Sequence, residues 1–207
     1  MVAQGGYGLT GQACTATSRV IATGGAHDRF VEALTAQAEG FAPGDGQREG
    51  VKMGPVVSDS QLDTDLSYMD VARDEGAEVV TGGTNEDLFF QPAILAGVSP
   101  EMRVAREEIF GPVVSVIRAG DLDEAIAITN ASPYGLTGGI VTNDLKAAMR
   151  FADEAEVGVV KINRPTTGLD LNAPFGGYKQ SSTGTFREQG STATDFYTRI
   201  KTVYMGA

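Results

Sequence analysis

The alternation of strand-like and helix-like segments is the feature that most restricts how this chain can fold. Helix-like segments with an apolar face occupy about 29–39, 58–75, 121–130 and 145–155. Strand-like segments rich in apolar and β-branched residues lie at about 19–22, 78–81, 89–98, 113–117, 138–142 and 157–162. Strands that alternate with helices of this length predict an α/β fold with a mostly parallel sheet and helices on both faces.

Four polar residues stand where the predicted helices begin. Asp28, Ser58, Asp121 and Asn143 each precede an amphipathic segment. A side-chain oxygen at such a position accepts a hydrogen bond from a backbone N–H of the first turn. We therefore predict that these residues cap the helices. The β-branched run 113–117 predicts a central strand.

Charge and cysteine content restrict the partners and the compartment. The chain has 27 acidic and 16 basic residues, a net charge of −11 at pH 7. Nucleic acid is not expected as a partner, because phosphate binding needs a basic surface. No stretch approaches the roughly 20 apolar residues of a membrane helix, so no membrane partner is expected. A single cysteine is typical of a reducing compartment, and we expect the protein in the cytoplasm.

Cys14 is the only cysteine, and its local context allows either a small buried hydrophobe or a reactive thiol. The order Gln12-Ala13-Cys14 matches part of the caspase signature, but Ala16 stands where that family has glycine, and no histidine precedes it. A papain-like pair would have to recruit His27, the only histidine, without an obvious orienting partner. One cysteine and one histidine cannot fill a structural zinc shell, so no metal is expected.

The glycines at the start of the chain match the pattern of a dinucleotide-binding loop. Residues 6–11 read G-Y-G-L-T-G. That loop needs a strand before it to deliver the glycines to a helix N-terminus. The few residues before Gly6 do not favour a strand, and we reject this interpretation.

Four motifs together resemble those of the aldehyde dehydrogenase superfamily. Residues 11–19, G-Q-A-C-T-A-T-S-R, resemble its nucleophile motif G-Q-x-C-x-A-x-x-R. Residues 107–113 resemble E-E-x-F-G-P-V, residues 130–136 resemble N-x-x-x-Y-G-L, and residues 174–181 resemble P-F-G-G-x-K-x-S. The resemblance extends over the whole chain, which is well under half of a typical family member.

The resemblance implies roles for five residues. Cys14 is implied to be the nucleophile that attacks an aldehyde, and NAD or NADP the cofactor. Glu108 matches the position that binds the nicotinamide ribose, and Phe110 the position beside the nicotinamide. Phe175 and Leu169 match positions that line the substrate tunnel. The alternatives are a solvated carboxylate at Glu108 and ordinary packing at the three apolar side chains.

Further substrate-pocket predictions concern the surroundings of the thiol and a long loop. Ala13 and Thr15 are small and leave room for a substrate beside Cys14. Residues 163–190 lack periodicity, which favours an ordered functional loop. Residues 161–168 and 181–190 resemble, more loosely, the dehydrogenases of 2-oxoglutarate semialdehyde (2,5-dioxopentanoate). Arg164 could bind a substrate carboxylate in a bidentate pair, or it could be a surface arginine paired with Asp170.

The resemblance also predicts the domain organisation. It implies a catalytic α/β domain at 1–195, a C-terminal oligomerisation strand at 196–207, and a homodimer or homotetramer. It places the dinucleotide-binding domain and the glutamate general base before Met1. We therefore expect these 207 residues to be a fragment that is not a competent dehydrogenase alone. The alternatives are a non-catalytic interaction domain of this fold, and a relative that transfers the acyl group to coenzyme A.

Overall fold

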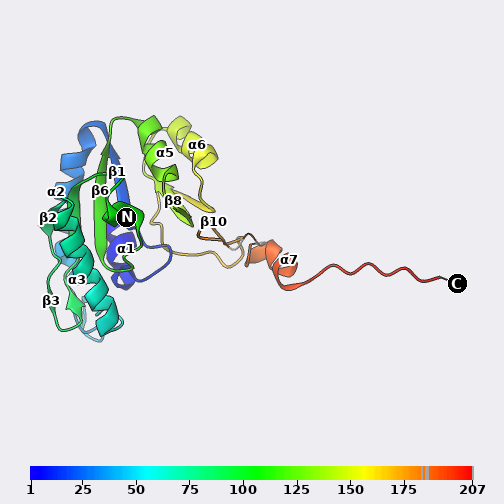
Figure 1. Ribbon diagram of the computed structural model, residues 1–207, viewed down its shortest axis with the longest axis horizontal. Helices are drawn as coiled ribbons and strands as arrows, with labels where there is room; N and C mark the ends of the chain where they lie inside the picture. The colour runs from blue at the N-terminus through cyan, green and yellow to red at the C-terminus, as the bar shows by residue number, and fades with distance from the viewer. Residues whose placement is uncertain (183, 185–186, 207) are drawn as a thin grey trace.

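The computed structural model describes residues 1–182, 184 and 187–206, and the chain forms a larger body, a smaller body and an extended tail (Figure 1). The helices and strands of the larger body are α1 (Val2–Tyr7), β1 (Arg19–Thr23), α2 (His27–Ala38), α3 (Asp59–Asp74), β2 (Glu78–Thr81), β3 (Asn85–Glu86), β4 (Phe89–Phe90), β5 (Ala93–Val98), α4 (Arg103–Arg106) and β6 (Val113–Ala119). Three short 3₁₀ turns accompany them, η1 (Gly8–Gly11), η2 (Gly24–Ala26) and η3 (Glu39–Phe41).

A four-stranded sheet forms the centre of the larger body. Its strand order is β1-β6-β5-β2, in which β6 pairs in parallel with both β1 and β5, and β2 pairs with β5 antiparallel. The prediction of a mostly parallel sheet is therefore confirmed. The β-branched residues of β6 are buried on both faces, as an interior strand requires, so the predicted central strand is confirmed as well.

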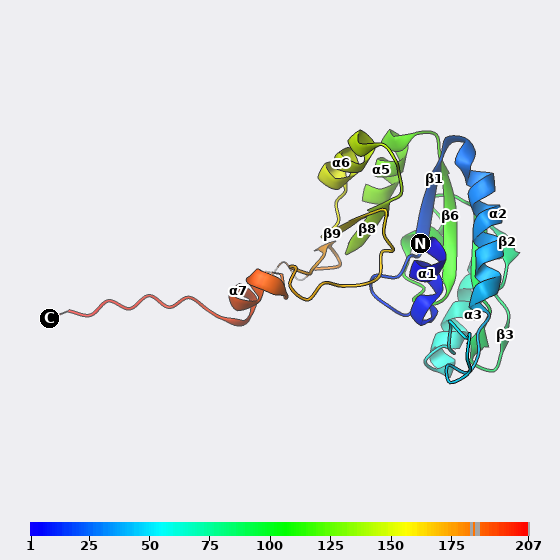
Figure 2. The same cartoon turned by 180° about the vertical axis from the view of Figure 1, so that it is seen from behind.

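Each face of this sheet carries its own apolar cluster. On one face, α1 and α2 pack on the sheet, and Tyr7, Leu34 and Val114 are buried there. On the other face, α3, α4 and α5 (Leu122–Asn130) cover Leu95 and Ile117. Alternate residues of β6 point to opposite faces, because side chains in a strand have a period of two. Helices thus cover both faces, as Figure 2 shows from behind.

The smaller body is built from short elements. Its sheets are a parallel pair, β8–β9, and an antiparallel pair, β7–β10. Ile126 of α5 packs there with Phe151 and Val157. The elements that follow α5 are β7 (Tyr134–Gly135), β8 (Thr137–Ile140), α6 (Leu145–Glu154), β9 (Val159–Ile162), β10 (Tyr178–Lys179), η4 (Gly190–Thr192) and α7 (Ala193–Tyr197).

Two of the four predicted helix caps are confirmed. The Ser58 side chain accepts a hydrogen bond from the backbone N–H of Gln61, and the Asp121 side chain accepts one from Glu124. The cap predicted at Asn143 is wrong: α6 begins at Leu145, as predicted, but the capping residue is Asp144, whose side chain accepts from the backbone N–H groups of Lys146 and Ala147.

The cap predicted at Asp28 is also wrong. α2 begins at His27, so Asp28 lies inside the first turn instead of before it. Its carboxylate instead accepts from Arg118 at 2.6 Å.

The end of the chain differs from the predicted strand at 196–207. Phe196 and Tyr197 lie in α7, and residues 198–206 form neither helix nor strand. Figure 1 shows this tail running away from both bodies. Residue 207 lies outside the described residues. Among the helices that the structure describes, none has the length and apolar character needed to cross a membrane.

Candidate active site

Cys14 lies on a tight turn between η1 and β1. The backbone N–H of Ala16 donates to the carbonyl of Ala13 at 2.8 Å, which closes the turn and leaves Cys14 exposed and free. The side-chain carbonyl of Gln12 accepts from the N–H of Val57 at 2.8 Å and fixes the entry to the turn. The thiol is therefore presented to solvent from a hydrogen-bonded loop, and the interpretation of Cys14 as a small buried hydrophobe does not hold.

Gly11 joins this turn to the loop that carries Glu108 and Phe110. Its φ is 67°, in the left-handed region that favours glycine. A Cβ on Gly11 would collide with the carbonyl group of Gly111 and with the nitrogen of Pro112. The two backbones can touch only because residue 11 has no side chain, and this contact brings two distant motifs together.

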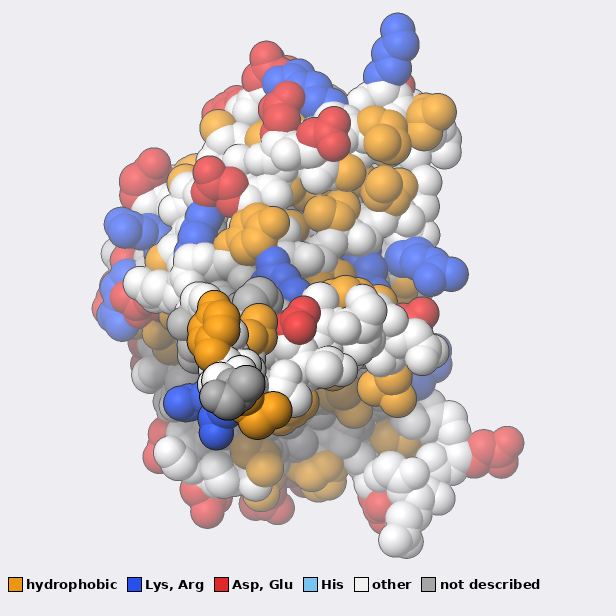
Figure 3. Space-filling model, turned by 90° about the vertical axis from the view of Figure 1, so that its right-hand side faces the viewer, with side chains coloured by type: hydrophobic (Ala, Val, Ile, Leu, Met, Phe, Trp, Pro, Cys, Tyr) orange, Lys and Arg blue, Asp and Glu red, His pale blue; other side chains and the backbone are white. Residues whose placement is uncertain are grey.

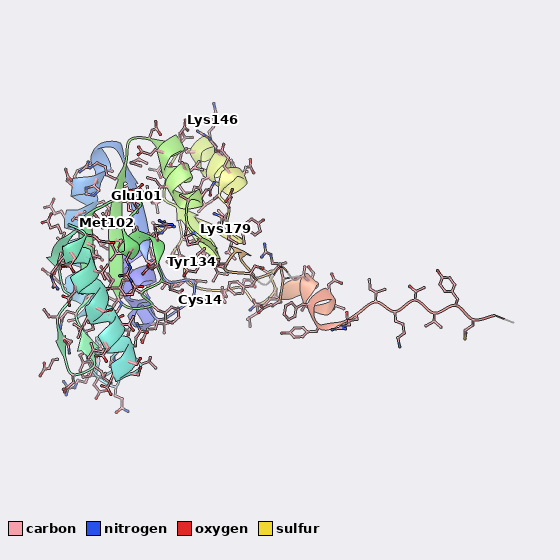
Figure 4. All side chains as sticks on the ribbon, in the orientation of Figure 1. Cys14, Glu101, Met102, Tyr134, Lys146 and Lys179 are labelled. Atoms are coloured by element: carbon pink, nitrogen blue, oxygen red, sulfur yellow. The ribbon has the colours of Figure 1, made fainter. Side chains whose placement is uncertain are left out.

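A pocket of about 520 Å³ opens between the two bodies of the molecule. Five of the predicted site residues line it, namely Ala13, Cys14, Glu108, Phe110 and Phe175. Figure 4 places Cys14 and Tyr134 at this junction, with Lys179 beside them. Residues separated by more than 150 positions in the sequence therefore share one cavity.

The two neighbouring glutamates of the 107–113 motif have different surroundings. Glu107 pairs with Arg103 at 2.9 Å and accepts from the Tyr68 hydroxyl at 2.8 Å. These hydrogen bonds hold the pKa of Glu107 below its ordinary value. Glu108 is exposed on the pocket and bonds to no other described residue. Its carboxylate is thus free to accept from the hydroxyl groups of a ligand.

Phe110 has an unusual backbone conformation. Its φ is 61°, which is rare for a bulky residue and is retained only where the surroundings impose it. The side chain is 38% exposed and lines the pocket. A partly exposed ring on a fixed turn offers a flat apolar surface to a ligand ring.

The opposite wall is the loop that carries Phe175. The backbone carbonyl of Phe175 accepts from Glu188 at 3.1 Å, and Arg187 donates to the carbonyl of Gly177 at 2.6 Å. The ammonium group of Lys179 donates to the carbonyls of Asn130 and Ser132 at 2.6 and 3.2 Å. Two of the sequence motifs, 130–136 and 174–181, therefore meet through hydrogen bonds.

Three of the predicted substrate-pocket residues lie elsewhere. Thr15 follows Cys14 on the same turn but is buried, so it does not line the pocket. Arg164 and Leu169 are exposed on the loop after β9 and do not line it either. Arg164 forms no ion pair with Asp170 among the residues that the structure describes.

Several pocket residues received no role in the sequence interpretation. Arg19, Tyr134 and Arg187 line the cavity. Burial lowers the pKa of Arg19, and no described carboxylate pairs with it. Arg19 and Tyr134 belong to the motifs of residues 11–19 and 130–136, which is the signal that could have identified them.

Metal binding finds no support in the part of the chain that is described. No group of three His, Cys, Asp or Glu side chains lies close enough there to hold an ion. The Nδ1 atom of His27 lies 2.9 Å from the carboxylate of Asp28 and 3.1 Å from the guanidinium of Arg118, and His27 does not line the Cys14 pocket.

The comparisons with known proteins agree with one another. The sequence model described as "Aldehyde dehydrogenase family" matches residues 1–203. An alpha-ketoglutarate semialdehyde dehydrogenase from Haloferax volcanii is 49% identical, with 99% of this chain and 43% of that protein aligned. A 2,5-dioxopentanoate dehydrogenase from Saccharolobus solfataricus is 46% identical, with 100% of this chain and 44% of that protein aligned.

Solved structures give the same result. A betaine aldehyde dehydrogenase from Staphylococcus aureus, in complex with NAD+, superposes with a TM-score of 0.90 at 37% identity. The alignment covers 95% of this chain and 40% of that one. The chain thus spans about two fifths of the length of the relatives it matches.

Proposed function

Because this chain belongs to the aldehyde dehydrogenase family, we propose that it supplies the catalytic thiol of an enzyme that oxidises an aldehyde to a carboxylate. The observation that carries the proposal is the shared pocket of Cys14, Glu108, Phe110 and Phe175. An exposed thiol, a free carboxylate and two aromatic rings around one cavity of about 520 Å³ suit a small substrate beside a larger cofactor.

Cys14 acts in this proposal as the nucleophile. Its thiolate attacks the aldehyde carbon, and the new C–S bond gives a thiohemiacetal with a negatively charged oxygen. The backbone N–H of Cys14 donates to no described acceptor, so it is available to that oxygen. Such a donor is worth ~3 to 4 kcal/mol in a preorganised site.

The cofactor we propose is NAD, with NADP as the alternative. The exposed carboxylate of Glu108 would accept from the hydroxyl groups of the ribose, and the Phe110 ring would contact the nicotinamide. When bound, NAD+ supplies the oxidising power that converts the thiohemiacetal into a thioester. Water then cleaves the thioester bond, which releases the carboxylate and restores the Cys14 thiol.

The substrate we propose is 2-oxoglutarate semialdehyde. The support is the similarity to two proteins named for this activity, together with the arginines that line the pocket. Arg164 lies away from the pocket, so its position favours the alternative of a surface arginine. We therefore expect Arg164→Ala to leave the preference for acidic over neutral aldehydes unchanged.

We propose that residues 196–207 pair with a second copy of the chain. The described part of the tail exposes four large apolar side chains, Ile200, Val203, Tyr204 and Met205. Figure 3, which views the molecule from the side where the chain ends, shows hydrophobic side chains at the front of that face. Deleting residues 198–207 from the whole protein should lower the molecular mass measured by light scattering from that of a dimer or tetramer to that of a monomer.

The test of the proposed function is turnover of the whole protein with the semialdehyde and NAD+. We expect NADH formation that is lost in Cys14→Ser. Acyl transfer that requires coenzyme A would favour the acylating alternative, and no turnover at all would favour an interaction domain. The 207-residue chain alone is expected to show no turnover, and a rate near the ~10 per second of a typical enzyme would contradict that expectation.

A further inference from the structure

Asp65 is a buried carboxyl group that the proposed chemistry does not use. It lies on α3, is 0% exposed, and its Oδ2 atom has no hydrogen-bond partner among the described residues. A buried carboxyl oxygen without a partner is costly and uncommon, so the position requires an explanation.

One side of this carboxyl group is bridged to the turn at Ile109. The Nε2 atom of Gln61 donates to Oδ1 of Asp65 at 2.8 Å and to the carbonyl of Ile109 at 3.0 Å. One side-chain amide thus uses both of its protons to join the carboxyl group to the backbone just before Phe110.

The carboxyl group also touches the backbone just after Phe110. A Cβ on Gly111 would collide with both oxygens and with the carboxyl carbon of Asp65. Asp65 therefore occupies the space where a side chain at residue 111 would be. The two contacts, through Ile109 and at Gly111, flank the one residue of this turn that is held at a positive φ.

We propose that Asp65 is a positioning residue that clamps the 109–111 turn, and that its uncharged form holds the turn closed. A strained φ persists only where neighbouring contacts impose it. Gly111 in turn contacts Gly11, so the clamp reaches the loop of Cys14 through the backbone. Release of the clamp lets Phe110 relax and turns its ring away from the pocket.

The chemistry of the carboxyl group explains the preference for the uncharged form. Burial raises the pKa of Asp65 to about 6, against a single opposing hydrogen bond from Gln61. Within the described ranges, no ionisable side chain on the surrounding elements forms an ion pair or hydrogen bond with Asp65. These side chains are Tyr68, Arg103, Arg106, Glu107, Glu108 and Cys14. Ionisation places a charge that no cation offsets, and opening the turn to water relieves it.

The direct test is a pH titration of the 207-residue chain by NMR. We expect the backbone amides of Phe110, Gly111 and Gly11 to shift with the midpoint of the Asp65 carboxyl carbon, near pH 6. The shift should vanish in Asp65→Asn and remain in Asp63→Asn, an exposed carboxylate two residues away. Amide chemical shifts that do not change with the ionisation of Asp65, or a midpoint near pH 4 for Asp65, would contradict the proposal.

A kinetic test addresses the consequence for catalysis, which rests on the proposed role of Phe110. In the whole protein, the KM for NAD+ should rise about 2- to 30-fold as the pH increases through 6. The Asp65→Asn variant should lack this rise, while Asp63→Asn should keep it. A pH-independent KM alongside positive NMR results would overturn the link to the cofactor and leave the clamp standing.

Discussion

The wall of the pocket that carries Cys14, Glu108 and Phe110 stands on the four-stranded sheet, whereas the wall that carries Phe175 is a loop. On the first wall, the turns follow η1 and α4 and lead into β1 and β6. β6 is buried in the two main clusters, and β1 packs against them with the buried Ala22 and the partly buried Val20 and Ile21. On the second, the loop after β9 is fixed by a two-residue pairing, by Lys179 and by Arg187.

This difference indicates how each half of the site responds to damage. Side chains on a packed sheet are held in place by many apolar neighbours, so a local change there is transmitted to the core. A loop held mainly by hydrogen bonds opens locally at a lower cost than global unfolding. In the proposed function, the nucleophile and the cofactor contacts therefore belong to the rigid wall, and the substrate contact at Phe175 belongs to the adaptable one.

The largest effect is expected from Gly11→Ala on the rigid wall. Its Cβ would collide with the Gly111 backbone, and its φ of 67° is strained for alanine. We expect a loss of about 4 kcal/mol in the free energy of unfolding, since overpacking and strain each cost about 1 to 3 kcal/mol. Urea denaturation measures this. Gly50→Ala, with φ of 84° and open space around its Cβ, is the control and should lose only about 1 kcal/mol.

The next largest effect is a gain of stability in Asp65→Asn. The folded-state pKa of about 6 lies above the ordinary Asp value of 3.8, so the wild-type chain loses stability as the pH rises from about 4 through 6. Asparagine keeps the acceptor for Gln61 and carries no charge. At pH 8 the variant should be more stable by about 3 kcal/mol, and the difference should shrink toward pH 3. Equal stability of both proteins at pH 8 would show that Asp65 is not desolvated.

On the loop wall, Gly158→Ala should have a smaller global effect. Its Cβ would collide with the Gly176 carbonyl, but that partner belongs to a loop that can yield. We expect the free energy of unfolding, measured by urea denaturation, to fall by about 1 to 2 kcal/mol. Faster hydrogen exchange should be confined to residues near 175–188. Gly54→Ala, whose Cβ would meet nothing within 4 Å and whose φ is not positive, serves as the control. A loss for Gly158→Ala as large as that of Gly11→Ala would remove the contrast between the walls.

The smallest effect is expected at the start of α3, the helix that carries Gln61 and Asp65. Ser58→Ala removes the side-chain acceptor of the Gln61 N–H and should lower the free energy of unfolding, measured by urea denaturation, by about 1 kcal/mol. Ser60→Ala on the same turn, an exposed residue whose hydroxyl has no described partner, should cost less than half as much. Equal losses from the two variants would show that Ser58 does not cap the helix.

Periodicity predicted the parts of the fold that have long repeating patterns. The run 113–117 is β-branched at four of its five positions, which is typical of an interior strand, and β6 is that strand. β7 and β10 have two residues each, too few to show a period. The cap of α6 was placed one residue early because Asn143 and Asp144 can both accept, and only the backbone decides between them.

In the site, the residues that belong to the sequence motifs were the ones that could be predicted. Five predicted residues line the pocket, but Thr15 does not, since a tight turn that exposes Cys14 points its neighbour inward. Asp65 was missed, although it lies at helical spacing from Leu62 and Met69 on the apolar face of α3. A carboxylate on that face is a signal that sequence alone could have shown. That Asp65 meets Gly111 depends on tertiary packing, which no local pattern encodes.

The central claim is that Cys14 is the nucleophile, and mass spectrometry of the acid-quenched whole protein during turnover with the semialdehyde and NAD+ tests it most directly. We expect a single acyl adduct on the peptide that contains Cys14, and neither adduct nor turnover in Cys14→Ser. Undiminished turnover in Cys14→Ser, or an adduct on any other residue, would contradict it.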